Sequence, residues 1–264
     1  MASGSSLVKK SARTILKGNW TASIFVACIP LFTVFICSYS VSLLAIVSGE
    51  LIADILFLVL GIVLIFPMCL GLLRFFWRVI FGEHDSPVSV FYYFSDKSKY
   101  WKALFFILSM AFRAIIYGVL LNIPMFILNI ITHSFMYELI GISLPVWTAN
   151  LTNVKIILEV VAKVILISIM LKFYLAPMLF VADDNMEPAE AMHMSSVISK
   201  KSSVDFIYLG FSFIIWIILS FLVIPIIFTL PYIVVSYLIH SRVAIAEYNA
   251  HIEQTEYDYQ SYMA

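Results

Sequence analysis

The chain has 264 residues, of which 62% are hydrophobic and 12% are charged, and its mean hydropathy is +1.02. Soluble globular proteins carry about 25% charged residues, so this composition excludes a water-soluble enzyme and predicts an integral membrane protein. The 16 basic and 16 acidic side chains give a formal net charge of zero, which leaves no overall basic field to attract nucleic acid. We therefore expect no nucleic-acid partner.

Basic residues precede the first apolar run, as they do in a signal sequence. Lys9, Lys10, Arg13 and Lys17 come before residues 21–47, a stretch without a charged residue. This stretch is far longer than the roughly 7 to 15 residues of a signal-peptide core, and it has no convincing small-residue cleavage site. We expect a retained signal anchor, preceded by a cytosolic amphipathic segment at residues 1–20.

Four apolar runs are long enough to cross a bilayer as helices, which takes about 20 residues. They cover residues 21–47, 51–81, 103–131 and 154–181. A fifth run, residues 206–243, would extend well beyond the hydrocarbon thickness as one helix, so it must break, and Pro225 and Pro231 are the predicted break points. It forms either two full spans joined by a tight turn near Pro225 or a re-entrant hairpin.

The predicted fold is an all-α, polytopic integral membrane bundle of six transmembrane helices with cytosolic interfacial helices. Residues 21–245 form its membrane domain, and residues 246–264 extend the last helix as a cytosolic tail. Near the predicted span ends, the Lys and Arg residues fall almost entirely on one side, and Lys155 falls on the other. Because loops rich in basic residues stay in the cytosol, both termini are predicted to be cytosolic. An aromatic-rich loop at residues 132–153 is then expected on the outer interface.

A weak threefold pattern accompanies the spans, because a short amphipathic segment precedes each odd-numbered one. These segments are residues 11–20, 87–101 and 188–205. The second and third align with Pro87 over Pro188 and Lys99 over Lys200, and proline after acidic residues is typical of a helix start. The pattern predicts three copies of an interfacial helix followed by a transmembrane hairpin, with chance alignment as the alternative.

Three segments of the chain resemble a known family. They are residues 12–20, which end in Leu-Lys-Gly-Asn-Trp; residues 67–71 followed by Arg74, Phe75 and Phe76; and Ala182-Asp183-Asp184-Asn185 running on to Ala191 and Ser195. Together they resemble the bacterial membrane family catalogued as domain of unknown function 975, over roughly residues 10–245. The resemblance implies a bacterial inner-membrane protein with several spans and carries over no activity. The chain departs from the family pattern in the loop at residues 132–153 and in lacking a glycine after Lys201.

Arg74 and Arg78 lie four residues apart, so they share one helix face near the cytosolic end of the second span. In one interpretation they are interfacial anchors whose guanidinium groups reach outward to lipid phosphates. In the other they point into the bundle as part of an anion-binding vestibule. The basic residues expected to join that vestibule are Lys17, Lys97, Lys99, Lys102 and Lys172. The candidate residues for binding a lipid or another anion are thus Arg74, Arg78, Arg113 and Lys172.

Arg113 lies inside the third span. Counted from Lys102 at about 1.5 Å per residue, it lies near the bilayer centre, where an unpaired charge costs at least ~3 kcal/mol. It then needs water or a partner, and Asp54 and Glu159 are the acidic residues within spans. Alternatively, the third helix protrudes into the cytosol and Arg113 is interfacial.

Glu159 and Lys163 have the spacing and the order that favour an intrahelical ion pair. A structural pair that faces the bundle interior is the preferred interpretation. The alternative is a solute path to which Asp54, Glu159 and Lys163 contribute.

No pattern in the sequence indicates a metal or another cofactor. The three cysteines lie within apolar runs, and the five histidines have no ligand spacing among them. Glu190 and His193 have the Glu-x-x-His spacing of carboxylate metal sites, but no second such motif accompanies them. We instead expect Asp184 or Asn185 to cap the helix that begins near Pro188.

These features predict a bacterial inner-membrane protein that is not an enzyme. The sequence contains no His-Glu-x-x-His, no Gly-x-Ser-x-Gly and no phosphate loop. We expect a scaffold or accessory protein whose cytosolic basic face binds anionic membrane lipids or a protein partner. A transporter or channel for a small solute or anion is the alternative, since buried charges and proline-broken helices mark such sites.

Overall fold

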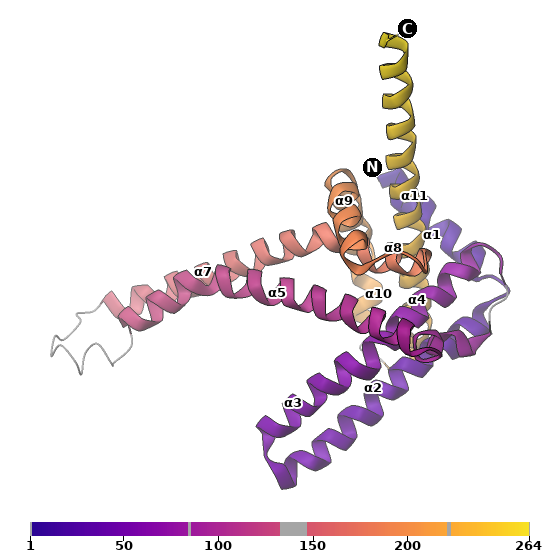
Figure 1. The fold of residues 1–264 in the computed structure, drawn as a ribbon. Helices are drawn as coiled ribbons and strands as arrows, with labels where there is room; N and C mark the ends of the chain where they lie inside the picture. The colour runs from indigo at the N-terminus through magenta and orange to yellow at the C-terminus, as the bar shows by residue number, and fades with distance from the viewer. Residues whose placement is uncertain (1, 84–85, 133–146, 221–222, 264) are drawn as a thin grey trace.

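The computed structural model describes residues 2–83, 86–132, 147–220 and 223–263, and within them every regular element is a helix (Figure 1). Four helical segments are long and apolar enough to cross a membrane, judged by length and composition. They are Trp20–Ile46, Glu50–Ile80, Lys97–Leu128 and Pro225–Gln254. The predicted all-α class is thus confirmed, and the first three segments lie where the apolar runs predict them.

Glycine turns separate the N-terminal helix from the first hairpin and reverse the chain within it. Helix α1 (Ala2–Leu16) ends at a turn where Gly18 has a φ of 101°, and α2 (Trp20–Ser48) follows. Gly49, with a φ of 87°, reverses the chain into α3 (Glu50–Leu60), so α2 and α3 form an antiparallel hairpin (Figure 1). These φ values lie in the left-handed region, which glycine enters without steric penalty.

The second span contains a π-helical turn that a proline and a tyrosine explain. The turn η1 (Gly61–Ile65) joins α3 to α4 (Phe66–Ile80) without interrupting the helix. Pro67 has no N–H to donate to the carbonyl of Val63 one turn earlier. The hydroxyl of Tyr100, at the start of the third span, donates to that carbonyl oxygen at 3.1 Å. This hydrogen bond ties the second span to the third.

A short 3-10 helix precedes the third span. The segment predicted at residues 87–101 divides into η2 (Pro87–Phe94) and the first turn of α5 (Lys97–Thr132). Helix α5 packs against α7 (Trp147–Met170), and the two form the second long hairpin (Figure 1). Most of the predicted outer loop, residues 133–146, lies outside the described residues.

The run at residues 154–181 is not one continuous helix, which corrects the predicted bounds of the fourth span. It divides into the later part of α7, η3 (Leu171–Phe173) and α8 (Ala176–Ala182). The break is stabilised by a later helix: the Oγ atoms of Ser195 and Ser199 donate to the carbonyl of Lys172 at 2.9 and 3.1 Å. The Oγ atom of Ser195 also accepts the N–H of Leu175 at 3.2 Å. Buried serines thus satisfy backbone groups that a broken helix leaves unpaired.

The last apolar run also breaks. It divides into the end of α9 (Pro188–Phe211), α10 (Ile214–Leu219) and α11 (Val223–Met263). The boundary between its second and third pieces lies close to Pro225, as predicted, whereas the predicted break at Pro231 does not occur. Pro225 lies in the first turn of α11, where an N–H has no helical partner in any case, and Pro231 lies within α11 without ending it. A further break, not predicted, lies near Ser212, whose carbonyl accepts a hydrogen bond from Nζ of Lys9 in α1 at 2.6 Å. Pro188 begins α9, as predicted.

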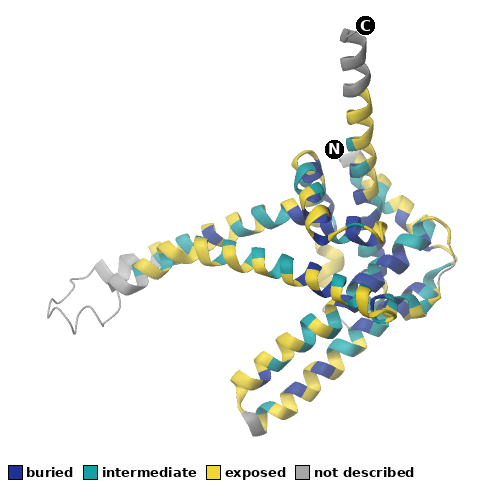
Figure 2. Ribbon diagram, viewed as in Figure 1, coloured by how far each residue is buried: buried dark blue, intermediate teal, exposed yellow. Residues whose placement is uncertain are grey.

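The buried core lies where the helices meet at the base of the hairpins. One cluster joins α1, α2, α4 and α11 around Phe75 and Phe76. A second joins α4, α5, α8 and α9, where the rings of Phe106 and Phe180 stack with centroids 4.5 Å apart. Figure 2 shows burial concentrated at this base, whereas the hairpins are largely exposed. Many of their exposed side chains are large and apolar, which suits a lipid environment.

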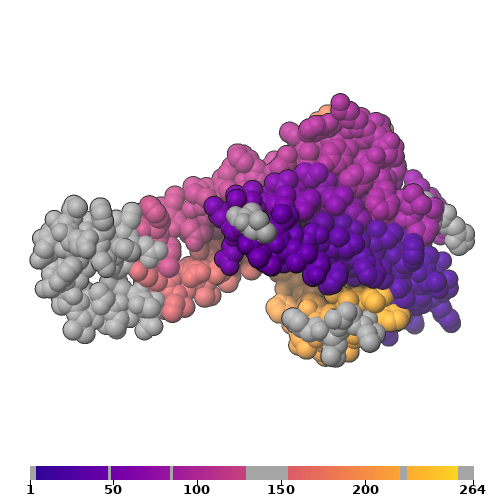
Figure 3. All heavy atoms as spheres, turned by 90° about the horizontal axis from the view of Figure 1, so that it is seen from below, coloured from indigo at the N-terminus to yellow at the C-terminus, as the bar shows by residue number. Residues whose placement is uncertain are grey.

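Beyond the base, the α2–α3 and α5–α7 hairpins project separately from the rest of the molecule (Figure 1). Seen from below (Figure 3), the α2–α3 hairpin in violet lies in front of the α5–α7 arm and beside α10 and the start of α11 in orange. Helix α1 packs against α11, and α11 extends beyond the start of α1, away from the α2–α3 hairpin (Figure 1). The base is therefore the part of the molecule where distant segments are brought together.

Candidate functional site

The base is organised around an ion pair between Arg74 of α4 and Asp184, which follows α8. Nη2 of Arg74 lies 2.9 Å from Oδ2 of Asp184, and Nη1 contacts Oδ1, so the pair is bidentate. The side chain of Arg74 is 8% exposed, and that of Asp184 is 51% exposed. Arg74 therefore points into the bundle, and its interpretation as an outward lipid anchor is wrong.

Further polar contacts surround Asp184 and the neighbouring Tyr92. The hydroxyl of Tyr92 in η2 donates to Oδ2 of Asp184 at 3.0 Å, and Nζ of Lys102 in α5 donates to the main-chain carbonyl of Asp184 at 2.6 Å. Cations also contact the Tyr92 ring: the guanidinium carbon of Arg74 is 3.6 Å from its centroid and Nζ of Lys99 is 4.1 Å away. We call this group the arginine junction. Its members are Arg74, Arg78, Tyr92, Lys99, Lys102 and Asp184.

A close backbone approach allows η2 to reach the junction. A Cβ atom placed on Gly71 of α4 would lie 2.0 Å from the carbonyl oxygen of Val90, closer than any real contact. Only glycine therefore permits this packing of α4 against η2, which carries Tyr92 to Arg74. Both Gly71 and Arg74 belong to one of the three segments on which the family resemblance rests.

The junction is electrostatically unbalanced. Burial alone would raise the pKa of the Asp184 carboxyl, but hydrogen bonds from Arg74 and Tyr92, with the charges of Arg74 and Lys99, hold this pKa below its usual range. Asp184 is thus a carboxylate at neutral pH. Among the described residues, one carboxylate faces the cations of Arg74, Lys99 and Lys102, so the positive charge is in excess. In addition, Nε of Arg74 is buried without a hydrogen-bond partner among the described residues.

An open cavity of about 480 Å³ lies beside this excess charge, between α4 and η2. Its polar lining consists of Arg74, Arg78, Ser89, Tyr92 and Ser95, and the rest of its lining is Val88, Phe91 and Phe94. Nε of Arg78 lies 4.0 Å from a carboxylate oxygen of Glu83, at the long end of an ion pair. The charged groups that line the cavity are both arginines. The geometry suits a ligand with an anionic group and an apolar part.

The vestibule predicted from the sequence is realised only in part. Lys99 and Lys102 join Arg74 and Arg78, as the vestibule interpretation requires. Lys172 is exposed in η3, and the structure uses its carbonyl rather than its ammonium group, as an acceptor for serines of α9. Lys17 is exposed beyond the end of α1.

Arg113 lies level with the end of α7 rather than midway along a hairpin. Its guanidinium carbon is 5.6 Å from the ring centroid of Phe173, which directly follows α7 in η3. Helix α5 is longer than α7, so it extends past its partner toward the base. Arg113 pairs with neither Asp54 nor Glu159, and its Nε is buried without a hydrogen-bond partner among the described residues.

The residues of the predicted solute path do not converge. Nζ of Lys163 lies 2.7 Å from Oε1 of Glu159, so the predicted intrahelical pair forms. The side chains of Lys163 and Glu159 are 69% and 46% exposed, so in this structure the pair lies on an open face of α7. Asp54 is exposed on α3, in the other hairpin.

The acidic segment after α8 does not act as the predicted helix cap. Asp184 binds Arg74, and Oδ1 of Asp183 accepts the N–H of Asn185 at 2.9 Å within a local turn. The N-cap residue of α9 is Glu187, without a side-chain hydrogen bond to the helix. Among the described residues, no group of three or more His, Cys, Asp or Glu side chains is arranged to hold a metal ion.

The three segments that carry the family resemblance all belong to the base. Ala12 and Leu16 are fully buried in the first cluster, Arg74 and Asp184 form the ion pair, and Ser195 supports the break after α7. Residues 1–246 match the sequence pattern of a family whose description is protein of unknown function, DUF975. No curated protein and no solved structure matches the chain significantly. On the strength of the match over residues 1–246, the chain belongs to the DUF975 family.

Proposed function

We propose that this protein is a six-span, non-catalytic membrane scaffold whose basic end binds anionic lipid headgroups. Four helical segments have the length and composition of membrane spans. Two further segments supply the other two crossings. One is helix α7, which packs along α5, and the other runs from the end of α9 through α10, which packs on α11. The α2–α3 and α5–α7 hairpins each return the chain to the base (Figure 1), and this arrangement supports an even number of crossings.

The distribution of basic residues orients this arrangement. The cations of α1, the arginine junction and Arg242 lie at the base, and the positive-inside rule assigns this end to the cytosol of a bacterial cell, in its inner membrane. Single cysteines introduced at Ser98 and at Asn249 should therefore resist a membrane-impermeant maleimide in intact cells. Labelling of either position from outside would contradict the orientation, and an external cysteine at Gly49 is the positive control.

The observation that carries the lipid-binding proposal is the excess of cations at the arginine junction beside the cavity of about 480 Å³. Phosphate groups form charge-assisted hydrogen bonds with Arg and Lys, and these are stronger than neutral ones. At the membrane surface the abundant phosphates belong to lipids, and their acyl chains would lie along the exposed apolar hairpins.

Native mass spectrometry tests this proposal. The protein is released from micelles that contain equal amounts of phosphatidylglycerol and phosphatidylcholine, and the retained lipids are counted. We expect wild type to retain phosphatidylglycerol preferentially, and Arg78→Gln with Lys99→Gln to lower this retention about tenfold, because two charge-assisted contacts are lost. The control, Lys155→Gln with Lys163→Gln, removes the same charge from α7. Equal loss in both double variants, or no preference in wild type, would contradict a specific site.

One observation supports a second function, transport of a small anion. The buried Nε of Arg113 has no hydrogen-bond partner among the described residues, so this N–H can donate to a permeating anion. Chloride and phosphate flux into proteoliposomes measures this directly. Flux that falls in Arg113→Gln, but not in Lys163→Gln, would favour transport over a scaffold.

A further inference from the structure

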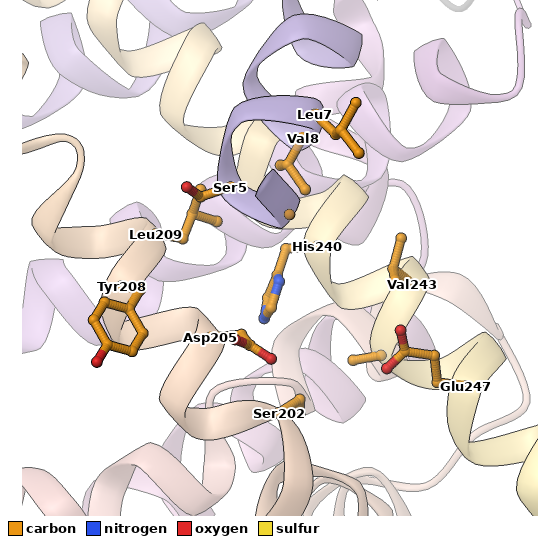
Figure 4. A pocket seen from close by; sticks show the side chains of 12 residues that line it. Ser5, Leu7, Val8, Ser202, Asp205, Tyr208, Leu209, His240, Val243 and Glu247 are labelled. Atoms are coloured by element: carbon orange, nitrogen blue, oxygen red, sulfur yellow. The ribbon is translucent and has the colours of Figure 1, made fainter. Parts of the chain in front are cut away.

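A second cavity, of about 370 Å³, lies between the start of α1, the second half of α9 and the middle of α11 (Figure 4). Its polar lining is Ser5, Ser202, Asp205, Tyr208, His240 and Glu247. The apolar side chains around them include Leu7 and Val8 of α1, Leu209 of α9, and Val243 and Ala244 of α11. It shares no lining residue with the arginine junction. Its volume lies within the range of about 300–1,000 Å³ that is usual for small-molecule sites.

The cavity carries the opposite charge to the junction. The charged residues that line it, Asp205 of α9 and Glu247 of α11, are both acidic. Neither forms a hydrogen bond or an ion pair within the described part of the chain. Lys9, one residue after the α1 lining, does not neutralise them, because its Nζ is bound to the carbonyl of Ser212 and lies 4.4 Å from the ring centroid of Phe213.

The back of the cavity is a buried polar network. His240, 9% exposed, points from α11 toward Asp205 (Figure 4). Its Nε2 is 3.3 Å from the hydroxyl of Tyr174, which in turn donates to Oγ of Ser202 at 2.8 Å. Burial raises the pKa of Tyr174 to about 12, so this hydroxyl keeps its proton at neutral pH. Tyr174 thus fixes His240 and Ser202 from behind, whereas the two carboxylates remain available to a ligand.

The cavity lies at the basic end of the molecule, which the proposed orientation places in the cytosol. The guanidinium carbon of Arg242, one turn from His240 on α11, is 4.5 Å from the ring centroid of Phe81, which ends α4. The start of α1 forms one wall of the cavity. The later part of this helix is anchored by Nε of Arg13, which donates to the hydroxyl of Tyr232 at 3.1 Å.

We propose that this cavity binds a protonated primary amine with a short alkyl chain. An ammonium group can donate to the carboxylates of Asp205 and Glu247, while the alkyl chain lies against Leu7, Val8 and Val243. A quaternary ammonium ion fits less well, because such ions are held in cages of several aromatic rings and Tyr208 is the one aromatic ring besides His240 in the lining. The charge complementarity selects a cation, and the apolar walls select one with a hydrocarbon part.

Binding can be measured on the full-length protein in nanodiscs with hexylamine as the probe, by isothermal titration at pH 7. The matched probes are 1-hexanol, which lacks the charge, and hexyltrimethylammonium, which lacks the N–H donors. We expect hexylamine to bind at least tenfold more tightly than either of them. Equal heats for hexylamine and hexanol would show simple partitioning into lipid and would overturn the proposal.

Isosteric variants locate the site. Asp205→Asn and Glu247→Gln should each weaken hexylamine binding about tenfold, because each removes one charged acceptor. Asp54→Asn, which neutralises an exposed acid on the first hairpin, should leave it unchanged. Val243→Phe keeps both carboxylates and fills the cavity, so it should also abolish binding. Wild-type affinity in Asp205→Asn and Glu247→Gln, or an equal loss in Asp54→Asn, would contradict the assignment.

Hydrogen exchange gives a second readout that does not depend on any variant. Because the start of α1 forms one wall of the cavity, bound hexylamine should slow amide exchange in residues 4–8 and leave the first hairpin unchanged. Unchanged exchange at residues 4–8 under saturating hexylamine would count against the site even if the amine bound elsewhere. Neither measurement involves anionic lipid, so the amine site and the lipid site fail or succeed separately.

Discussion

Replacing Asp184 with asparagine tests the ion pair on which the base depends. The change keeps the shape of the side chain but removes the countercharge of Arg74, which is 8% exposed. Breaking a fully buried pair costs about 3–5 kcal/mol, whereas an exposed pair contributes about 0–1 kcal/mol. Because Asp184 itself is 51% exposed, we expect an intermediate loss of about 2 kcal/mol in the free energy of unfolding.

Replacing the partner, Arg74, should lower the free energy of unfolding by less than Asp184→Asn does, and this asymmetry makes the test specific. In Arg74→Met the partner left behind is a half-exposed carboxylate that water can solvate, and the methionine replaces the apolar stem of the arginine, so we expect a loss of about 1 kcal/mol. Unfolding in mixed micelles of dodecyl sulfate, followed by tryptophan fluorescence, measures both values and the double variant. A loss below about 0.5 kcal/mol for Asp184→Asn, or additive losses in the double variant, would refute a coupled buried pair.

Three further predictions address the same region. The pKa of Asp184 is lowered in the folded protein. Its stabilising contribution should therefore be fully present above its unfolded pKa of about 3.9 and be lost as the pH falls through the lower folded value. The difference in unfolding free energy between wild type and Asp184→Asn should shrink only below about pH 4. Gly71→Ala should destabilise the protein by about 1–3 kcal/mol because its Cβ would overlap the backbone of η2, whereas Gly118→Ala, with no atom within 4 Å of the added Cβ, should be neutral or stabilising in the same denaturation assay. Tyr100→Phe should lower the free energy of unfolding by about 1–2 kcal/mol because it leaves the carbonyl of Val63 without a donor. The loss should be smaller in a Pro67→Ala background, which restores the backbone N–H. An equal loss in both backgrounds would contradict the hydrogen bond from Tyr100 as a replacement for that N–H.

The hairpins could be predicted from the sequence because their cause is local. Apolar runs of sufficient length form the helices that can cross a membrane, and Gly49 supplies the reversal between the first two. Pro188 was expected to begin a helix, and it does, because proline fits a first turn without loss of a hydrogen bond. The same reasoning failed at Pro231, since a proline within a membrane helix is tolerated where neighbouring groups satisfy the backbone.

The break after α7 and the arginine junction could not be predicted, because their causes lie far along the chain. Hydropathy continues through η3 into α8, and only the serines of α9 reveal where the helix ends. Asp184 lies 110 residues from Arg74, and its position before a proline favoured a local capping role. The signal that did point to the junction is the family resemblance, in which both residues occur in the segments that carry it.

The position of the polar contacts explains why this base, rather than the hairpins, carries the candidate sites. In lipid the hydrophobic effect does not drive one helix against another, so hairpins with apolar surfaces need close packing or hydrogen bonds to hold a fixed arrangement. Here the bond from Tyr100 to the Val63 carbonyl and the contacts of Asp184 with Arg74 and Lys102 join the second span to the third and to α8. Among the described residues, the one carboxylate of Asp184 does not balance the cations of Arg74, Lys99 and Lys102, and in the proposed orientation this excess charge faces the headgroup region. The contacts that hold the hairpins together therefore also create the electrostatic attraction on which the proposed lipid binding depends.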